Sequence, residues 1–332
     1  MIQPRLIACA AAVLAVSTGV WLRRKRRLSA DRLVVAITGC DSGIGYSTAL
    51  HCHCRGFTVV AAVLDLNSSG AQDLLRIAQI SGRLEVVMVD VRHSQDISRL
   101  VDRVSSLLDN NNNLKFHSII NNAGVMVFGE MEWQTEQIVD LQLEVNLLGA
   151  ITVARLFAPL LRKYKGRVIN MTSHCGSLPL PGLSVYAASK AGLQAWSDAL
   201  RVEWAKYNIS VISLIPGAFF QQTNILSNQN AHAETMLKAM SEEAKKFYGS
   251  YYQLYQSYLT ALSGDKPAAP VQSVALYRLL DSALLDPRPR PHYHNTPWRY
   301  SLYHNLACVA PIVLRDALVT RFVAMPQYKP DK

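Results

Sequence analysis

The stretch from residue 38 to residue 45 decides the fold, and it reads Thr38-Gly39-Cys40-Asp41-Ser42-Gly43-Ile44-Gly45. It follows the apolar run 33–37, and a segment with helical periodicity comes after it. Glycines at such a turn let the backbone approach a ligand closely, and the N-terminus of the helix offers amide donors and a positive dipole end. The sequence therefore predicts a strand, a phosphate-binding turn and a helix in succession.

Five further runs rich in Val and Ile alternate with helical segments along the chain. They cover residues 58–64, 84–89, 118–120, 167–171 and 209–215. Strands that alternate with helices form a parallel sheet covered on both faces. We therefore expect an α/β fold with a single Rossmann-type, doubly wound parallel sheet, in a catalytic domain over residues 31–295.

Two segments fall outside this alternation. Residues 219–262 are helical, polar and aromatic, and their place after the last predicted strand makes them a candidate substrate lid. Five tyrosines near helical spacing form a stripe there, which is more often a packed face than a chemical site: Tyr248, Tyr251, Tyr252, Tyr255 and Tyr258. After the Pro-rich linker 287–291, residues 298–323 are apolar and aromatic with three Arg residues, which is typical of an interfacial helix. We expect residues 296–332 to form an apolar, membrane-associated extension.

Composition and charge narrow the class of protein. The chain has 332 residues, 50% hydrophobic and 17% charged, with a mean hydropathy of +0.09, which excludes disordered and fibrous classes. Its net charge of +10 resides in the two apolar termini, while residues 31–285 carry as many acidic as basic residues. This distribution favours contact with an anionic membrane surface and argues against a nucleic-acid partner, whose groove needs basic residues on the folded body.

The N-terminus reads as a membrane anchor over residues 1–30. Residues 6–22 are uncharged, and the basic block 23–27 follows at once, so the positive-inside rule keeps the body in the cytosol. We expect an endoplasmic reticulum membrane protein, because a secretory signal has its basic residues before the apolar run. A mitochondrial presequence is the alternative, since no acid precedes Asp31, and insertion in the membrane plane also stays open.

The cysteines predict neither disulfides nor a metal site. Cys52 and Cys54 alternate with His51 and His53 in a predicted helix, where successive side chains point to different faces and cannot close round one ion. Free cysteines also agree with a reducing cytosolic compartment.

Two carboxylates follow predicted strands next to the glycine turn. Asp65 ends the second strand, where a carboxylate accepts both ribose hydroxyls of an adenosine and repels a 2′-phosphate. Asp90 closes the third strand, within reach of an adenine amino group. The pattern predicts a dinucleotide cofactor, with NAD(H) preferred over NADP(H).

A second group of residues carries acid–base chemistry. Tyr186 and Lys190 are four apart on a predicted helix and share a face. A Tyr acts as a base near neutral pH only if its pKa falls, and an adjacent Lys ammonium together with a cationic nicotinamide lowers it by stabilising the phenolate. Ser173 ends the fifth strand and can hold a substrate oxygen, Asn146 lies in the preceding helix, and residues 121–124 read Asn-Asn-Ala-Gly after the fourth strand.

Together these motifs resemble the short-chain dehydrogenase/reductase family over residues 31–300. The N-terminal anchor, the Cys-Asp-Ser-Gly turn and the C-terminal extension are similar to its microsomal retinol and hydroxysteroid branch. Residues 121–130, 172–176 and 321–326 resemble the insect Shroud, or non-molting glossy, group of moulting-hormone biosynthesis. The resemblance implies that Asn146, Ser173, Tyr186 and Lys190 form the catalytic set, with Asn146 supporting a water, and that subunits can pair through the Tyr-bearing helix as a homodimer.

The predicted cofactor site combines the turn, the strand ends and the family motifs. It comprises Gly39, Ser42, Gly43, Ile44, Gly45, Asp65, Asp90, Val91, Asn122, Ala123, Gly124, Tyr186, Lys190, Pro216, Gly217 and Thr223. The family places a Thr about five residues after the Pro of Pro-Gly, where this chain has Gln221, so either Gln221 or Thr223 contacts the nicotinamide. His174, which follows Ser173, is expected in the pocket wall.

The leading hypothesis is an NAD(H)-dependent oxidoreductase for an apolar secondary alcohol or ketone, a sterol or steroid such as an ecdysteroid precursor. A retinol dehydrogenase is one alternative. A mitochondrial hydroxyacid dehydrogenase is another and needs a cation for the substrate carboxylate, for which the lid offers Lys238, Lys245 and Lys246. A nucleotide-binding scaffold on the same fold is the non-enzymatic alternative, and it predicts decay of the catalytic residues, all of which are present.

Overall fold

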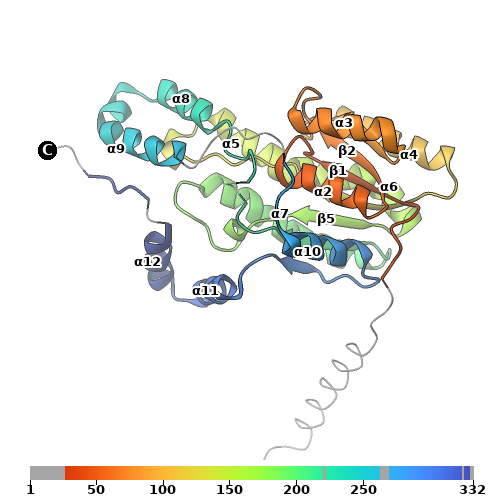
Figure 1. The fold of residues 1–332 in the computed structure, drawn as a ribbon. Helices are drawn as coiled ribbons and strands as arrows, with labels where there is room; N and C mark the ends of the chain where they lie inside the picture. Colours follow the sequence, from red (N-terminus) through yellow and green to blue (C-terminus); the bar gives the residue numbers. More distant parts are fainter. Residues whose placement is uncertain (1–26, 220–221, 262–268, 324, 330–332) are drawn as a thin grey trace, which may run out of the picture.

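Seven parallel strands form one sheet in the order β3-β2-β1-β4-β5-β6-β7 (Figure 1). This computed structural model describes residues 27–219, 222–261, 269–323 and 325–329. The strands are β1 (Leu33–Thr38), β2 (Thr58–Val63), β3 (Leu84–Met88), β4 (Lys115–Asn121), β5 (Arg167–Met171), β6 (Ser210–Ile215) and β7 (His292–His294). The predicted doubly wound sheet is confirmed, and β7 is an additional strand that the sequence analysis did not predict.

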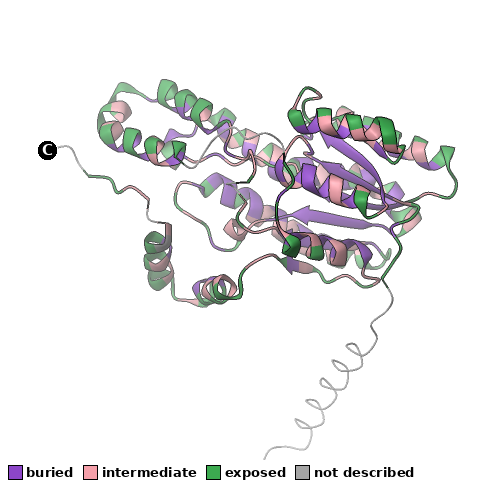
Figure 2. Ribbon diagram, viewed as in Figure 1, coloured by how far each residue is buried: buried purple, intermediate pink, exposed green. Residues whose placement is uncertain are grey.

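Helices cover both faces of this sheet. One face carries α2 (Gly43–Cys54), α3 (Ser69–Ser81) and α10 (Val274–Leu285), and the other carries α4 (Ser94–Asn110), α6 (Ala150–Tyr164) and α7 (Ser184–Ala205). Side chains of β1 alternate between the two layers: Val35 and Ile37 pack on the first face, Val34 and Ala36 on the second. The five inner strands are buried almost throughout, while the edge strands β3 and β7 are partly exposed (Figure 2).

The remaining elements surround the carboxyl edge of the sheet. They are η1 (Met131–Trp133), α5 (Glu136–Leu143), the wide helical turn η2 (Glu144–Gly149), η3 (His174–Gly176), α8 (Gln229–Ala239), α9 (Glu242–Thr260), α11 (Trp298–Val309) and α12 (Ile312–Val323). Helix α9 contributes the predicted tyrosine stripe. Tyr252 and Tyr255 pack edge-on against Trp133, with ring centroids 4.9 Å and 5.0 Å away, so the stripe closes the helical lid segment onto η1.

One continuous helical stretch among the described residues, Glu136–Tyr164, is long and apolar enough to cross a membrane. It comprises α5, η2 and α6, and its residues Val153 and Phe157 are buried against the sheet, so it belongs to the core of the fold. The predicted anchor segment 6–22 lies outside the described residues.

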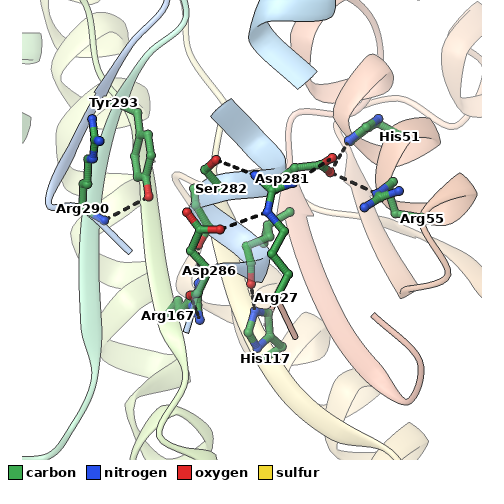
Figure 3. A network of polar contacts seen from close by, with 12 residues as sticks. Arg27, His51, Arg55, His117, Arg167, Asp281, Ser282, Asp286, Arg290 and Tyr293 are labelled. Atoms are coloured by element: carbon green, nitrogen blue, oxygen red, sulfur yellow. Dashed lines mark hydrogen bonds and ion pairs between the residues drawn. The ribbon is translucent and has the colours of Figure 1, made fainter. Parts of the chain in front are cut away.

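A polar network ties the start of the described chain to the C-terminal end of α10 (Figure 3). Buried Arg167 donates to the carbonyl oxygen of Asp286 at 2.7 Å, and His117 Nε2 binds that of Leu284 at 2.8 Å. Arg27 Nε donates to Asp286 Oδ1 at 3.1 Å. Cationic and N–H groups thereby satisfy carbonyls at the negative end of the helix dipole, and residue 27 is fixed to the body.

Candidate active site

A cavity of about 290 Å³ opens where β1 to β6 end, at the point where the sheet order reverses beside β1. Most predicted site residues line it: Gly39, Ser42, Gly43, Ile44, Gly45, Asp90, Val91, Asn122, Ala123, Gly124, Tyr186, Lys190, Pro216 and Thr223. Asp65, Asn146, Ser173 and Gly217 lie next to it without lining it, and Gln221 lies outside the described residues.

The glycine turn has the close packing that a pyrophosphate site needs. Gly39 has a φ of +70°, and a Cβ there would lie 2.7 Å from Ala123 Cα. A Cβ at Gly45 would lie 2.0 Å from the carbonyl oxygen of Gly39. Asn122 Nδ2 donates to the carbonyl oxygens of Thr38 and Gly39, both at 2.9 Å. The turn therefore keeps the N-terminus of α2 open to the cavity and fits the phosphates of a dinucleotide.

Asp41 is a site residue that the sequence analysis missed. Its Oδ1 accepts hydrogen bonds from the amides of Leu64 and Asp65, both at 2.9 Å, and the residue lines the cavity. Asp65 itself is exposed beyond β2, and its Oδ1 accepts from the amide of Asn67 at 2.8 Å. Two carboxylates thus lie together beyond β2, where the sequence analysis placed one.

Asp90 is engaged by a neighbour, Arg92, that the sequence analysis also missed. Arg92 Nε donates to both carboxylate oxygens of Asp90 at 3.0 Å, and Arg92 lines the cavity. The hydrogen bonds from Arg92 hold the pKa of Asp90 below its usual value. The guanidinium charge in this part of the cavity is therefore neutralised within the protein.

Tyr186 and Lys190 are buried together on α7. Lys190 Nζ donates to the carbonyl oxygen of Met171 at 3.0 Å and lies 5.9 Å from the centroid of the Tyr186 ring. Burial lowers the pKa of Lys190 to about 8, so the ammonium form still predominates at neutral pH.

The protein's own groups raise the pKa of Tyr186, whereas the predicted decrease also depends on a cationic nicotinamide. Burial raises it, the Cys175 thiol raises it further, and a side-chain hydrogen bond with Ser173 lowers it. The phenol is therefore protonated at neutral pH, because desolvation penalises the phenolate more than the hydrogen bond stabilises it. In this state Tyr186 is a proton donor.

Ser173 connects the end of β5 to the turn η3. Its hydroxyl accepts a hydrogen bond from the amide of Cys175 at 3.2 Å. The amide contact caps η3 and fixes the hydroxyl beside the phenol. Ser173 and Tyr186 can thus bind the same substrate oxygen.

Asn146 lies in the wide helical turn η2, a local distortion that often marks functional sites. Its Oδ1 accepts from the amide of Val125 at 2.8 Å, and its Nδ2 donates to the Val125 carbonyl oxygen at 2.9 Å and to Ser189 Oγ at 3.0 Å. Asn146 therefore joins the segment after Gly124 to α7. Its predicted support of a water stays a prediction.

The two residues of the Pro-Gly segment after β6 have different roles. Pro216 and Thr223 line the cavity, and a Cβ at Gly43 would come within 2.9 Å of Thr223 Cγ2. Gly217 has a φ of +98°, and a Cβ there would lie 2.5 Å from the Asn295 carbonyl oxygen, so glycine is required by the passing chain.

His174 lies away from the cavity. Its ring packs edge-on against those of His304 and Tyr300 of α11, with centroids 4.9 Å and 5.0 Å away. Burial, together with the neighbouring His304 and His294, lowers its pKa to about 4. The expectation of a pocket-wall residue is replaced by a contact with the C-terminal extension, which no local sequence signal indicates.

Comparison with known proteins agrees with this geometry. The sequence model of the family described as short chain dehydrogenase matches residues 33–234. Mitochondrial D-beta-hydroxybutyrate dehydrogenase of Rattus norvegicus is 32% identical over 294 residues, which are 87% of this chain and 84% of that protein. Estradiol 17-beta-dehydrogenase 2 of Rattus norvegicus is 31% identical over 89% of this chain and 76% of its own. Retinol dehydrogenase 7 of Rattus norvegicus is 31% identical, covering 91% and 94%.

Solved structures share the fold. A short-chain dehydrogenase from Streptomyces avermitilis has a TM-score of 0.62 at 23% identity and covers 88% of this chain and 97% of its own. A metagenomic short-chain oxidoreductase in complex with NADP has a TM-score of 0.51 at 27% identity, covering 57% and 84%. With the Tyr186 and Lys190 pair beside a nucleotide cavity, these matches lead to one conclusion: the chain belongs to the short-chain dehydrogenase family and is an oxidoreductase that interconverts an alcohol and a carbonyl group with a nicotinamide cofactor.

Proposed function

We propose that this enzyme uses NAD(H) to interconvert a secondary alcohol and a ketone on a sterol or steroid, such as an ecdysteroid precursor. The proposal is carried by the buried pair Tyr186 and Lys190 on α7, which lines the cavity beside the end of β5, where Ser173 lies. A proton donor and an orienting hydroxyl at this position suit a substrate oxygen next to the nicotinamide.

Each residue of the catalytic set has a separate task. Ser173 holds the substrate oxygen, and Tyr186 gives it a proton in reduction or takes one in oxidation. Lys190, charged at neutral pH, stabilises the phenolate when it forms. Asn146 keeps the chain after Gly124 in place against α7. A bound nicotinamide cofactor supplies or accepts the hydride.

An apolar substrate agrees with the cavity wall, in which Val125, Leu141 and Val145 are apolar. The steroid and retinol dehydrogenases among the relatives favour the same class. A hydroxyacid needs a cation for its carboxylate. Of the lid lysines, Lys238 and Lys245 pair with Glu234 and Glu242 of their own helices, at 3.9 Å and 2.8 Å.

Preference for NAD(H) is supported by the charges beyond β2. A 2′-phosphate at this position would meet the carboxylates of Asp41 and Asp65, while the guanidinium of Arg92 is already paired with Asp90. The hydroxyls of an unphosphorylated ribose can instead donate hydrogen bonds to a carboxylate.

The proposal includes an endoplasmic reticulum location, with residues 1–30 as the anchor and the catalytic domain in the cytosol. The mitochondrial location in the name of one relative is the alternative. Homodimer formation through α7 is also proposed, and the exposed Val202 gives that helix an apolar outer position.

Purified full-length protein, assayed with both cofactors against a steroid alcohol, retinol and D-3-hydroxybutyrate, tests the activity. We expect NAD-dependent oxidation of the steroid alcohol, absent in Tyr186→Phe. Faster turnover of D-3-hydroxybutyrate or retinol would replace the proposed substrate, and a preference for NADP would overturn the cofactor assignment. Sterol extracts of cells with and without the protein then identify the substrate itself.

A further inference from the structure

The C-terminal extension crosses the outer side of the loop between Ser173 and Tyr186. It leaves the sheet after β7, forms the hairpin α11–α12, and returns to the lid (Figure 1). There Met325 joins the lid cluster, and Tyr328 stacks on Phe247 of α9 with ring centroids 5.2 Å apart. The hairpin is therefore fixed to the body at both of its ends.

The inner face of the hairpin is held by packing. Ala307 and Val319 form a buried cluster with Leu178, which lies in the loop between Ser173 and Tyr186 (the catalytic loop). His304 is buried and packs against His174, the residue that follows Ser173. These contacts fix the orientation of the hairpin relative to the catalytic loop.

The outer face of α11 is apolar and has no partner among the described residues. Trp298, Leu302, Leu306 and Val309 follow one another at spacings of four, four and three, so they share one side of the helix. They are 72%, 53%, 57% and 81% exposed. Beyond Val309 the apolar surface continues through the turn into Ile312, Val313 and Leu314, of which Val313 is 83% exposed.

Such a continuous apolar surface marks an interaction site, because every Å² left in water costs about 25 cal/mol. Its charges indicate the occupant. Arg299 lies over the ring of Trp298 at 5.5 Å, and Arg315 and Arg321 belong to α12. Residues 286–332 contain seven basic and three acidic residues. Apolar side chains bordered by arginine match the interface of a bilayer with anionic headgroups.

The N-terminal end of the described chain lies on the same side. The basic block 23–27 ends at Arg27, which donates to Asp286 and to Ser282 Oγ at the end of α10, each at 3.1 Å (Figure 3). In Figure 1 this end and α11 both lie along the lower edge of the molecule. A membrane along that edge would meet Arg27 and α11 at once.

We propose that the α11–α12 hairpin docks on an anionic bilayer through the face formed by Trp298, Leu302, Leu306, Val309 and residues 312–314. Docking holds the loop that carries Ser173 next to the membrane, because the opposite face of the hairpin packs on that loop. An apolar substrate then enters from the lipid phase. The last point alone rests on the proposed function.

Quenching by brominated lipids tests the contact without turnover. Full-length protein is bound to phosphatidylcholine and phosphatidylserine vesicles with or without bromine on the acyl chains. The emission of the Trp298→Phe variant is subtracted from that of the wild type. The difference is the emission of Trp298, because the other tryptophans contribute to both. The double variant Leu306→Glu, Val313→Glu places charges in the face, and Ile80→Glu is the matched control, since Ile80 is 89% exposed on α3.

We expect bromine to quench the Trp298 share in the wild type and in Ile80→Glu, and this quenching to be lost in the double variant. NADH binding by every variant shows that the fold is intact. Equal Trp298 emission in the two kinds of vesicle would overturn the proposal. If the double variant instead halves the mass of a complex in solution, a second copy covers the face and the proposal is wrong. Neither result bears on the dehydrogenase activity, which is measured separately.

Discussion

We call the glycine turn and the segments that follow β1, β2 and β4 the nucleotide end of this enzyme, and η1, η3, α9 and α11 its substrate end. The two ends are held in place by different kinds of contact. At the nucleotide end, polar side chains that follow one strand bind the backbone after the next. Asn122 after β4 binds the carbonyls of Thr38 and Gly39, and Asp41 after β1 binds the amide of Asp65 after β2. The strand order alone brings these residues together, so the site is rigid before any ligand binds.

The substrate end depends on packing between segments far apart in the chain. η1 packs against α9, and η3 packs against α11. Several buried polar atoms there lack a hydrogen-bond partner among the described residues, namely both ring nitrogens of His174, Nε1 of Trp133 and the hydroxyl of Tyr255. We infer that changes at the nucleotide end act on binding and chemistry directly, while changes at the substrate end act through the docking of whole segments.

The largest effect is expected where the two ends meet. Tyr186→Phe removes only the transferable proton, so turnover should fall by roughly 10²- to 10⁴-fold while NADH binding stays nearly intact. Steady-state kinetics and NADH fluorescence measure the two quantities. Comparable activity in the variant would remove Tyr186 from the proposed role.

Lys190→Ala sharpens this result. Its ammonium both stabilises the phenolate and lies in the cavity wall, so the variant should weaken NADH binding as well as turnover.

Because burial raises the pKa of Tyr186, alcohol oxidation by the wild type should accelerate as the pH rises above neutral, whereas ketone reduction should not. A rise shared by both directions would point to a different titrating group.

A glycine substitution tests the rigidity of the nucleotide end. In Gly45→Ala the new Cβ would lie 2.0 Å from the Gly39 carbonyl oxygen, so we expect loss of NAD(H) binding and about 1–3 kcal/mol of stability. Gly82→Ala is the control. Gly82 also has a positive φ, +62°, but no atom lies within 4 Å of the added Cβ, and its NADH binding should equal that of the wild type. Calorimetry and thermal unfolding distinguish the two.

The sequence predicted the nucleotide end better than the substrate end for a physical reason. The first six strands and the glycine turn are marked by local periodicity and by residue types suited to their backbone. β7 escaped because its three residues, His292–His294, form no apolar run and gain their partner from β6. Asp41 escaped because its partners, the amides that follow β2, depend on which strand end lies beside it. Arg92 pairs with Asp90 only two residues away, but no local pattern indicates that this pair lines the cavity.

At the substrate end, local patterns were not sufficient. The position of His174 directly after Ser173 says nothing about what its side chain meets. The partner, α11, is more than a hundred residues further along the chain. The tyrosine stripe of α9 predicted a helix with a packed face, while its contact with Trp133 appeared only in the folded structure.

A smaller effect is expected for cofactor choice. Asp65→Asn removes one of the two carboxylates beyond β2, so the ratio of NADP(H) to NAD(H) use should rise by about tenfold, or about 1.4 kcal/mol. The effect is limited because Asp65 is exposed and Asp41 remains. kcat/KM with each cofactor measures the ratio. An unchanged ratio would mean that Asp41 sets the preference.

The smallest effect is a pH dependence confined to the substrate end. The pKa of His174 is lowered to about 4 from an ordinary value of 6.5, so folding favours the neutral ring. The neutral His174 ring contributes fully to the docking of α11 above pH 6.5. This contribution is lost as the pH falls toward 4, because the undocked ring, with its higher pKa, is protonated in this range and the docked ring is not. The full shift corresponds to about 3 kcal/mol, which solvent screening at this half-buried site reduces to on the order of 1 kcal/mol.

His174→Phe separates this effect from acid destabilisation elsewhere. Phe keeps the ring contact with Tyr300 and His304 but cannot be protonated, so α11 should stay docked to lower pH than in the wild type. His294 also faces this ring and can still be protonated, so part of the pH dependence should remain. Hydrogen exchange of the α11 amides between pH 7 and 5, corrected for intrinsic rates, gives the local stability.

His117, also with a pKa near 4, binds the end of α10 instead, so exchange in α10 should keep the same pH dependence in both proteins. If α11 and α10 respond alike to the substitution, the protonation acts on the whole fold and the two ends of the enzyme are not independent.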